Sequence, residues 1–116
     1  MINRLFVYGT LAPGCPNEHI LAPIQGSWVP ALVKGRLLNG GWGAQMGYPG
    51  MVPDANGDDI AGWVLSADNL AAHWPMLDEF EGAGYQRVVV CAQLDDGTQV
   101  DVYVYGLHQS AVEPGN

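Results

Sequence analysis

The segment with the clearest chemical character runs from Leu77 to Gly82. If it is helical, Leu77, Phe80 and Glu81 share one face by the three- and four-residue spacings, so Glu81 lies at the edge of an apolar surface. Glu81 also falls in the last helical turn, next to the negative end of the helix dipole and close to Asp78. Partial burial, the dipole and a nearby carboxylate all disfavour its ionised form, which suits a general base working near neutral pH. A solvated glutamate at a helix end is the simpler alternative.

A second candidate is Tyr8-Gly9-Thr10-Leu11, directly after a short apolar run that begins at Leu5. A glycine at a strand end lets the backbone turn and leaves N–H groups that bind an anion such as a carboxylate without a basic side chain. This is relevant because the chain has only four basic residues. An ordinary turn between a strand and a loop is the alternative.

Tyrosines form a third set. Tyr85 follows the expected helix stop, Tyr103 and Tyr105 lie on one face of the last expected strand, and Tyr48 sits in a glycine-rich loop. A tyrosine that points into a barrel offers an apolar wall with a hydroxyl at its tip. Most such residues belong to the core, so we expect only some of them to contact a ligand.

Metal and nucleotide sites are not indicated. The segment from Asp54 resembles the start of a calcium loop, but Asp59 stands where glycine is required and Leu65 where glutamate is required, so a hairpin turn is the better interpretation. No His/Cys set has complete zinc-ligand spacing, and no phosphate loop, dinucleotide fingerprint or nucleophile elbow is present. Of the two cysteines, Cys91 is interpreted as a small core residue in a strand, and Cys15 as a partly exposed free thiol.

Composition excludes several classes of partner. The 116-residue chain has 48% hydrophobic residues, 16 glycines and a net charge of -8. Such a surface repels phosphate backbones and anionic lipids, so we expect neither nucleic acid nor membrane as a partner. The longest unbroken apolar run is Val88 to Ala92, and the first residues lack a signal-peptide pattern, so we expect a cytoplasmic protein.

Periodicity and turn signals predict mainly strands. The expected strands are Leu5–Tyr8, Ala31–Leu38, Ile60–Leu65, Arg87–Leu94 and Gln99–Tyr105. The expected helices are Asn17–Leu21, Asn69–His73 with Asp68 as its cap, and Pro75–Glu81. The expected connections are a long loop over Asn39–Pro53, a tight turn of the hairpin type at Asn56-Gly57 and a hairpin turn over Asp95–Thr98.

These elements predict one domain over residues 1–108, followed by a disordered tail over 109–116. The fold class is α+β, mainly β, as a small mixed β-barrel with short flanking helices.

In order and spacing, the segments resemble the γ-glutamylcyclotransferase-like family, in particular its small bacterial-type γ-glutamylamine cyclotransferase-like proteins. The resemblance covers nearly the whole chain up to about Gly106. The matching motifs are Leu5-Phe6-Val7-Tyr8-Gly9-Thr10-Leu11, Tyr48-Pro49-Gly50, Gly62-Trp63-Val64-Leu65, Leu77-Asp78-Glu79-Phe80-Glu81-Gly82 with Tyr85-Gln86-Arg87, and Val102-Tyr103-Val104-Tyr105.

The resemblance implies a mixed β-barrel with a pocket at one end. It implies a reaction in which the α-amine of a γ-glutamyl group attacks its own side-chain carbonyl, releasing 5-oxoproline and an amine or amino acid, with no cofactor and no metal. Glu81 is then the catalytic acid/base, and the N–H groups of residues 9–11 hold the substrate carboxylate. The implied substrate-binding residues are Tyr8, Gly9, Thr10, Leu11, Tyr48, Tyr85 and Tyr105. We expect a small-molecule γ-glutamyl substrate and a monomer or homodimer.

Two other functions stay open. A non-catalytic small-molecule binding module would keep the pocket without turnover, although a retained Glu81 beside an apolar wall favours the enzyme. A protein-interaction domain would need an exposed apolar patch. Trp28 and Trp42 are candidates for such a patch, but buried anchors of loops are the better interpretation for both.

Overall fold

The computed structural model describes residues 2–8, 21, 24, 26–38, 50–81 and 85–107. The elements are β1 (Arg4–Val7), β2 (Ser27–Leu38), β3 (Gly50–Pro53), β4 (Asp58–Ser66), the 3-10 helix η3 (Leu70–His73), α1 (Trp74–Glu81), β5 (Tyr85–Leu94) and β6 (Gln99–Leu107). The predicted helix at residues 17–21, the cysteine at 15 and the tail over 109–116 lie outside the description, apart from residue 21.

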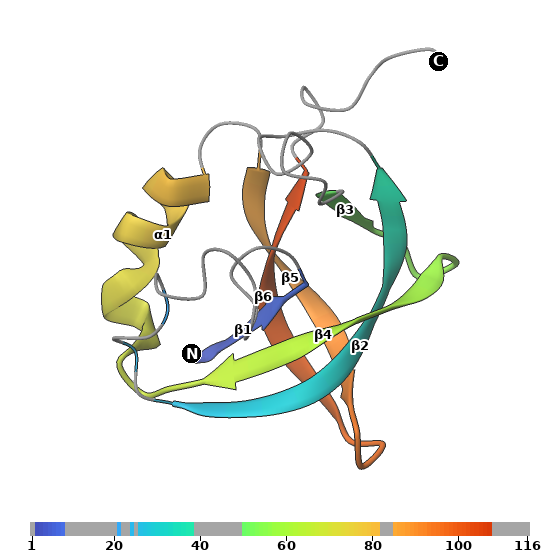
Figure 1. Ribbon diagram of the computed structural model, residues 1–116, viewed down its shortest axis with the longest axis horizontal. Coiled ribbons are helices and arrows are strands. Elements are labelled where there is room, and N and C mark those ends of the chain that lie inside the picture. Colours follow the sequence, from blue (N-terminus) through green and yellow to red (C-terminus); the bar gives the residue numbers. More distant parts are fainter. Residues whose placement is uncertain are drawn as a thin grey trace.

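Five strands close into a barrel in the order β2-β4-β1-β6-β5, and β5 pairs again with β2 (Figure 1). The β1–β6 pair is parallel and the others are antiparallel. β3 adds a sixth strand on the far part of β2. This confirms the predicted mixed β-barrel with a flanking helix.

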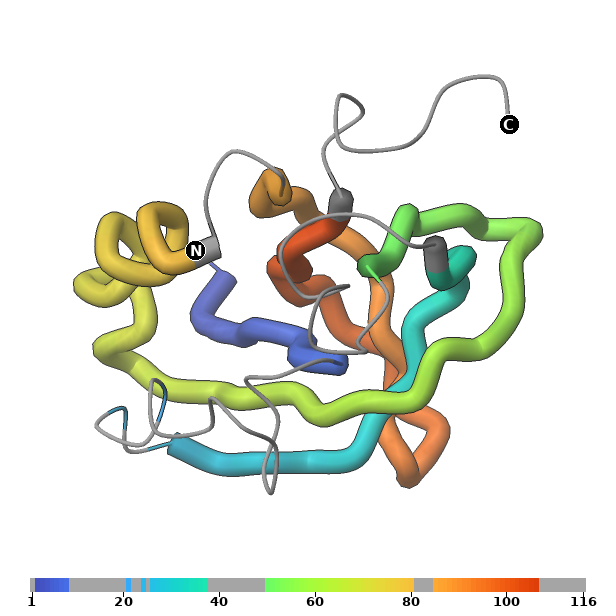
Figure 2. The backbone as a smooth tube through the Cα atoms, turned by 45° about the horizontal axis from the view of Figure 1, so that its top comes forward, coloured from blue at the N-terminus to red at the C-terminus, as the bar shows by residue number. Residues whose placement is uncertain are grey.

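Alternate residues of each strand point to opposite sides of the barrel wall, and each side has its own core. The inward side chains form the interior core of Phe6, Ala31, Val33, Met51, Ile60, Val64, Ala92, Val102 and Val104. The outward side chains of β1, β4 and β6 join those of η3 and α1 in an outer core that includes Leu5, Val7, Leu65, Leu70, Trp74, Leu77 and Tyr105. The helical segment therefore covers one side of the barrel (Figure 2).

The helical segment is short and depends on this outer core. Pro75 stands in the first turn of α1, as predicted, because its missing N–H is not needed there. Leu77 is fully buried, which stabilises the fold by roughly 1.5–3 kcal/mol. The predicted cap at Asp68 is wrong: η3 begins after Asn69, whose side chain makes no capping hydrogen bond. No helix in the described ranges is long and apolar enough to cross a membrane.

β2 is longer than predicted and includes Pro30. The carbonyl of Pro30 accepts a hydrogen bond from the N–H of Asp95 at 3.1 Å, on the side of β2 that faces β5. The backbone N and O of one residue in an antiparallel strand face the same side. The side of Pro30 that lacks an N–H therefore faces the position just beyond the end of β5 at Leu94, so no hydrogen bond of the β2–β5 pair is lost. The pairing with β4 on the other side of β2 is not interrupted.

Residues 50–53, predicted as part of a loop, form β3 instead, because Met51 is fully buried in the interior core. The predicted turn is present, with the N–H of Gly57 donating to the carbonyl of Asp54 at 2.8 Å. Its interpretation as a hairpin is wrong, since β3 and β4 lie on opposite edges of β2. The turn crosses β2 at Gly35, where a Cβ on Gly57 would lie 2.4 Å from the Gly35 carbonyl oxygen, so only glycine fits.

The β5–β6 hairpin confirms the Asp95–Thr98 prediction. Gly97 has a φ of 89°, a left-handed conformation that glycine adopts at little cost. The turn fixes the register of the whole hairpin, down to the pair of Tyr85 with Leu107. Cys91, predicted as a core residue, is an exposed free thiol, because the alternation along β5 sends its neighbour Ala92 inward and Cys91 outward.

Gly62 is required by close packing, which predicts the effect of Gly62→Ala. A Cβ at this position would lie 2.4 Å from the Val7 carbonyl oxygen and 2.6 Å from the Phe6 ring. We expect the free energy of unfolding to fall by about 1–3 kcal/mol or more, measured by urea denaturation. The exposed neighbour Ala61 is the control, and Ala61→Ser should change stability by less than about 0.5 kcal/mol. Equal stability of Gly62→Ala and the parent chain would contradict the packing argument.

Candidate active site

Several elements reach the same end of the barrel. β1 and β6 are parallel and so end there together, and β5 begins there because Tyr85 pairs with Leu107. α1 ends at Glu81, four residues before Tyr85, and so its last turn reaches the same end (Figure 1). We call this end of the barrel the mouth.

Tyr8 directly follows β1, and its hydroxyl joins two backbones at the mouth. The hydroxyl donates to the carbonyl oxygen of Tyr105 at 2.8 Å and accepts from the N–H of Met51 at 3.0 Å. It therefore connects β6 with β3, which are not neighbours in the sheet. A buried N–H without a hydrogen-bond partner costs about 1–3 kcal/mol of stability. The Tyr8 hydroxyl avoids this cost by accepting from the backbone N–H of Met51.

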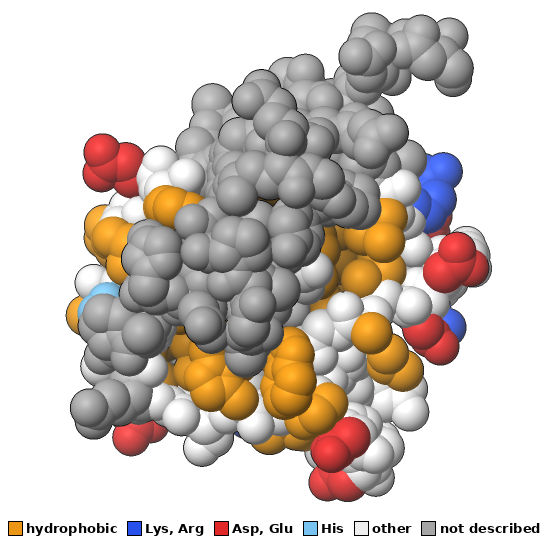
Figure 3. Space-filling model, viewed as in Figure 1, with side chains coloured by type: hydrophobic (Ala, Val, Ile, Leu, Met, Phe, Trp, Pro, Cys, Tyr) orange, Lys and Arg blue, Asp and Glu red, His pale blue; other side chains and the backbone are white. Residues whose placement is uncertain are grey.

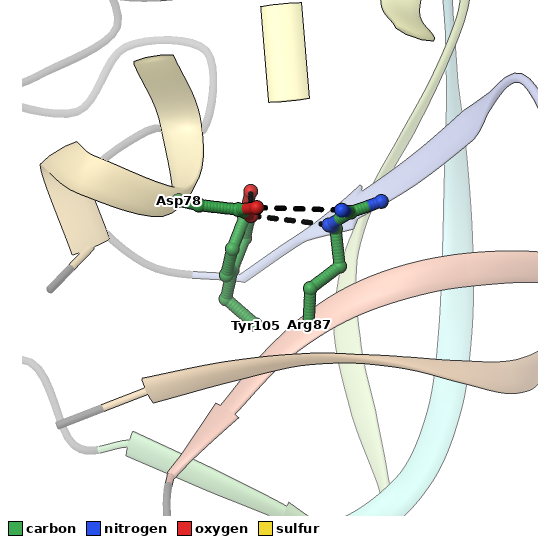
Figure 4. Close-up of polar contacts among 3 residues, drawn as sticks. All are labelled: Asp78, Arg87 and Tyr105. Carbon is green, nitrogen blue, oxygen red and sulfur yellow. Dashed lines mark hydrogen bonds and ion pairs between the residues drawn. The ribbon is translucent and has the colours of Figure 1, made fainter. Parts of the chain in front are cut away.

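Asp78 on α1, Arg87 on β5 and Tyr105 on β6 converge in one cluster (Figure 4). The Tyr105 hydroxyl donates to Oδ1 of Asp78 at 2.6 Å. The Arg87 guanidinium donates from Nε to the same oxygen at 3.1 Å and from its second terminal nitrogen to Oδ2 at 3.3 Å. The carboxylate thus receives three hydrogen bonds from two strands of the barrel.

Two rings hold the Arg87 guanidinium in place. Its carbon lies 4.5 Å from the centre of the Trp74 ring and 4.9 Å from that of Tyr103. The two rings pack edge to face, with centres 5.1 Å apart. Cation–π contacts of this kind contribute about 0.5–1 kcal/mol at exposed sites, so Arg87 is held by packing as well as by charge.

The environment of Asp78 favours its ionised form. Partial desolvation raises the pKa of Asp78, but the hydrogen bonds from Tyr105 and Arg87 and the charge of Arg87 together outweigh it and lower the pKa below its ordinary value of 3.8. Asp78 is therefore a carboxylate at neutral pH, and its charge is paired with Arg87.

Glu81 is the last residue of α1, one turn after Asp78. This agrees with the prediction that it ends the helix. The expected apolar face is present, with Leu77 fully buried and Phe80 partly buried. The side chain of Glu81 lies outside the description, so its role stays a prediction.

Three of the predicted binding residues are described, and two of them meet. Tyr8 and Tyr105 are joined by the hydrogen bond at the mouth, and Tyr85 begins β5 at the same end. The Tyr105 side chain does not point into the barrel but outward into the outer core, with 4% of its surface exposed. The other predicted residues, Gly9, Thr10, Leu11 and Tyr48, lie outside the description, and substrate contact by any of this set stays a prediction.

A hollow of about 360 Å³ opens beside Tyr8. It is lined by Tyr8, Gly35, Leu37, Asp58, Asp59, Ile60 and Ala61. One of its two carboxylates, Asp59, is paired with Lys34 at 2.7 Å. Two larger hollows, of about 410 and 510 Å³, lie away from Tyr8 and from Asp78.

Sequence reasoning did not identify the ion pair between Asp78 and Arg87. The signal was available in the hairpin register, because the turn at Gly97 places Arg87 opposite Tyr105 on neighbouring strands. The sequence does not reveal how α1 is rotated about its axis, and this rotation brings Asp78 next to Arg87 and Tyr105. The side chain of Asp78 is 45% exposed, and both of its oxygens accept hydrogen bonds.

The part of the chain that the structure describes holds no group of three or more His, Cys, Asp or Glu residues that could bind a metal ion.

Comparison with known proteins identifies relatives of the chain. Residues 5–115 match the family model described as gamma-glutamyl cyclotransferase, AIG2-like. No curated protein sequence matches the chain. Among solved structures, YkqA from Bacillus subtilis is 31% identical with a TM-score of 0.69, and the match covers 93% of this chain but 36% of YkqA. The chain thus spans little more than a third of the length of that relative.

Two further solved structures show the same fold at lower identity. An AIG2-like protein from Mus musculus is 23% identical with a TM-score of 0.67, over 97% of this chain and 80% of that protein. A gamma-glutamyl cyclotransferase specific to glutathione from yeast is 15% identical with a TM-score of 0.60, over 97% of this chain and 73% of that protein. At these identities the likeness supports the fold alone.

The lowered pKa of Asp78 predicts a pH-dependent effect of Asp78→Asn. A carboxylate with a depressed pKa stabilises the fold above its ordinary pKa, and this contribution is lost as the pH falls through the folded-state value. We expect Asp78→Asn to lower the free energy of unfolding by about 0.5–1 kcal/mol at pH 7, because the pair is half exposed. The difference from the parent chain should shrink below about pH 4. Urea denaturation across pH 2.5–7 measures this difference in the free energy of unfolding. Asp68→Asn, at an exposed position, is the control. A difference that does not change with pH would contradict a stabilising role of the Asp78 charge.

Proposed function

The chain belongs to the AIG2-like gamma-glutamyl cyclotransferase family, and we propose that it is an enzyme that releases 5-oxoproline and an amine or amino acid from a γ-glutamyl substrate, with Glu81 as the general acid/base. One observation carries the proposal. The matched region includes both the Tyr8 to Leu11 segment and Glu81, and Tyr8 lies at the same end of the barrel as the last turn of α1. A substrate at the mouth would lie within reach of both.

The proposed reaction is an intramolecular aminolysis. The α-amine nitrogen of the γ-glutamyl group attacks its own side-chain carbonyl carbon, and the new C–N bond closes a five-membered ring. The amide C–N bond to the leaving group breaks. The α-nitrogen loses two protons as the ammonium becomes the lactam N–H, and the leaving nitrogen takes up both and departs as an ammonium. No cofactor is needed in this scheme because the nucleophile is part of the substrate.

In this scheme the protein supplies geometry and one proton shuttle. Holding the amine near the carbonyl in a bent conformer lowers the entropic part of the activation free energy. For well-oriented reactions this effect is worth up to roughly 7–11 kcal/mol. Glu81 takes the proton from the ammonium and returns it to the leaving amine, a contribution of about 10²–10⁴ in rate. The N–H groups of residues 9–11 are proposed to hold the substrate carboxylate.

Glu81→Gln tests the proposed base. Glutamine keeps the shape of the side chain but cannot accept the proton, so kcat should fall about 10²–10⁴-fold while substrate binding persists. The assay is release of 5-oxoproline from a panel of γ-glutamyl compounds, with binding followed by calorimetry. Glu79→Gln is a matched control, because Glu79 is exposed on the same helix. Near-normal turnover by Glu81→Gln would remove Glu81 from the mechanism, and binding without turnover by the parent chain would favour a binding module.

The charge distribution bears on the leaving group. Three of the four basic side chains are in ion pairs, Lys34 with Asp59, Arg36 with Asp54 and Arg87 with Asp78. In the view of Figure 3, the clearly visible basic side chains lie at the right edge of the molecule, next to acidic side chains. Paired cations bind an additional carboxylate poorly, and the net charge of -8 repels anionic ligands.

We therefore predict that γ-glutamyl amines with a neutral or cationic leaving group are better substrates than glutathione, whose leaving side carries a further carboxylate. The measurement is kcat/KM for both substrates at low and high salt. The preference should be largest at low ionic strength, because salt screens the repulsion between separated charges. A clear preference for glutathione that does not change with salt would contradict the charge argument.

A further inference from the structure

α1 cannot hold its own last turn firmly. It has eight residues, and isolated helices shorter than about 12–15 residues are marginal in water. Trp74 and Leu77 bury one face of the helix in the outer core. These apolar contacts fix the distance of the helix from the barrel, but apolar contacts are not directional and leave its rotation less well determined.

Asp78 supplies the directional contact. Its two oxygens accept hydrogen bonds from Arg87 on β5 and from Tyr105 on β6, so α1 is fastened to both strands of the hairpin near the mouth (Figure 4). The guanidinium also lies over the rings of Trp74 and Tyr103, and these contacts restrict its movement. The Asp78 side chain is a carboxylate at neutral pH, so all three hydrogen bonds are charge-assisted.

Tyr105 also reaches the other side of the mouth. Its side chain donates to Asp78, and its carbonyl oxygen accepts from the Tyr8 hydroxyl at 2.8 Å. One residue of β6 thus connects the helix that ends at Glu81 with the end of β1, which leads into Gly9. Because Asp78 lies three residues before Glu81, a rotation that carried Asp78 away from the hairpin would carry Glu81 with it.

We propose that Asp78, Arg87 and Tyr105 are positioning residues that fix the last turn of α1 relative to the end of β1, and so hold Glu81 in the place where it transfers the proton. The inference rests on the proposed role of Glu81. It assigns Tyr105 to geometry, in place of the substrate contact predicted from the sequence. An intramolecular cyclisation is sensitive to such placement, since a displacement of about 1 Å can cost about 10²-fold in rate.

Tyr105→Phe removes only the hydroxyl that donates to Asp78. We expect kcat for 5-oxoproline release to fall about 10–100-fold, with KM changed less than about twofold. Tyr103→Phe is the matched control: it removes a hydroxyl from the same face of the same strand, keeps the ring beneath Arg87, and should leave both constants near those of the parent chain. Asp78→Asn, which keeps the shape but weakens the bonds, should reproduce the loss of kcat.

A second measurement is independent of activity. Hydrogen exchange of the Phe80 and Glu81 amides should become about tenfold faster in Tyr105→Phe and Asp78→Asn, while the β6 amide of Val104 stays protected and Tyr103→Phe exchanges like the parent chain. If no γ-glutamyl compound is turned over, the proposed function fails, and the exchange rates alone decide whether the cluster fixes the helix end.

Three results would overturn the inference. Unchanged exchange at residues 80 and 81 in both variants would show that the cluster does not hold the helix end. A raised KM with unchanged kcat in Tyr105→Phe would make Tyr105 a substrate contact. An equal loss of kcat in Tyr103→Phe would show general loosening of the outer core.

Discussion

The alternation of side chains across the barrel wall is the constraint on which the rest of the structure depends. Each of β1, β4 and β6 is buried on both faces, with one residue in the interior core and the next beneath the helices. A shift of one residue in any of these strands would exchange the two cores. The same alternation sends the side chain of Tyr105 outward to Asp78, while its carbonyl remains in the plane of the wall and accepts from Tyr8. A single residue can therefore act on both sides of the mouth.

The polar cluster at the helix end contributes more to geometry than to stability. Asp78 and Arg87 are half exposed or less, and pairs of this kind contribute about 0–1 kcal/mol to the free energy of unfolding. Their hydrogen bonds are directional, however, and they involve a helix too short to be rigid on its own. The apolar contacts of Leu77 and Trp74 supply the stability, and the charged contacts determine which way the last turn of α1 faces.

Features encoded by short stretches of sequence were predictable, and features that depend on distant contacts were not. The β5–β6 hairpin follows from four turn residues, and the end of α1 at Glu81 follows from apolar spacing and the glycine after it. β3 was missed because its four residues carry no alternation of their own and are fixed by pairing with β2. The exposure of Cys91 depends on which face of β5 is covered, and the meeting of Asp78 with Arg87 depends on how a helix lies across a hairpin.

The pairing of the first strand with the last has a consequence for how the chain is made. β1 lies parallel to β6, and the hydrogen bond from Tyr8 to Tyr105 joins residues 97 positions apart. During synthesis on the ribosome β1 emerges before β6, and one of its two edges has no partner until β6 has left the exit tunnel. The barrel can therefore close only after β6 is available, with a large loop-closure entropy, and until then an apolar strand edge is open to chaperones and to other nascent chains.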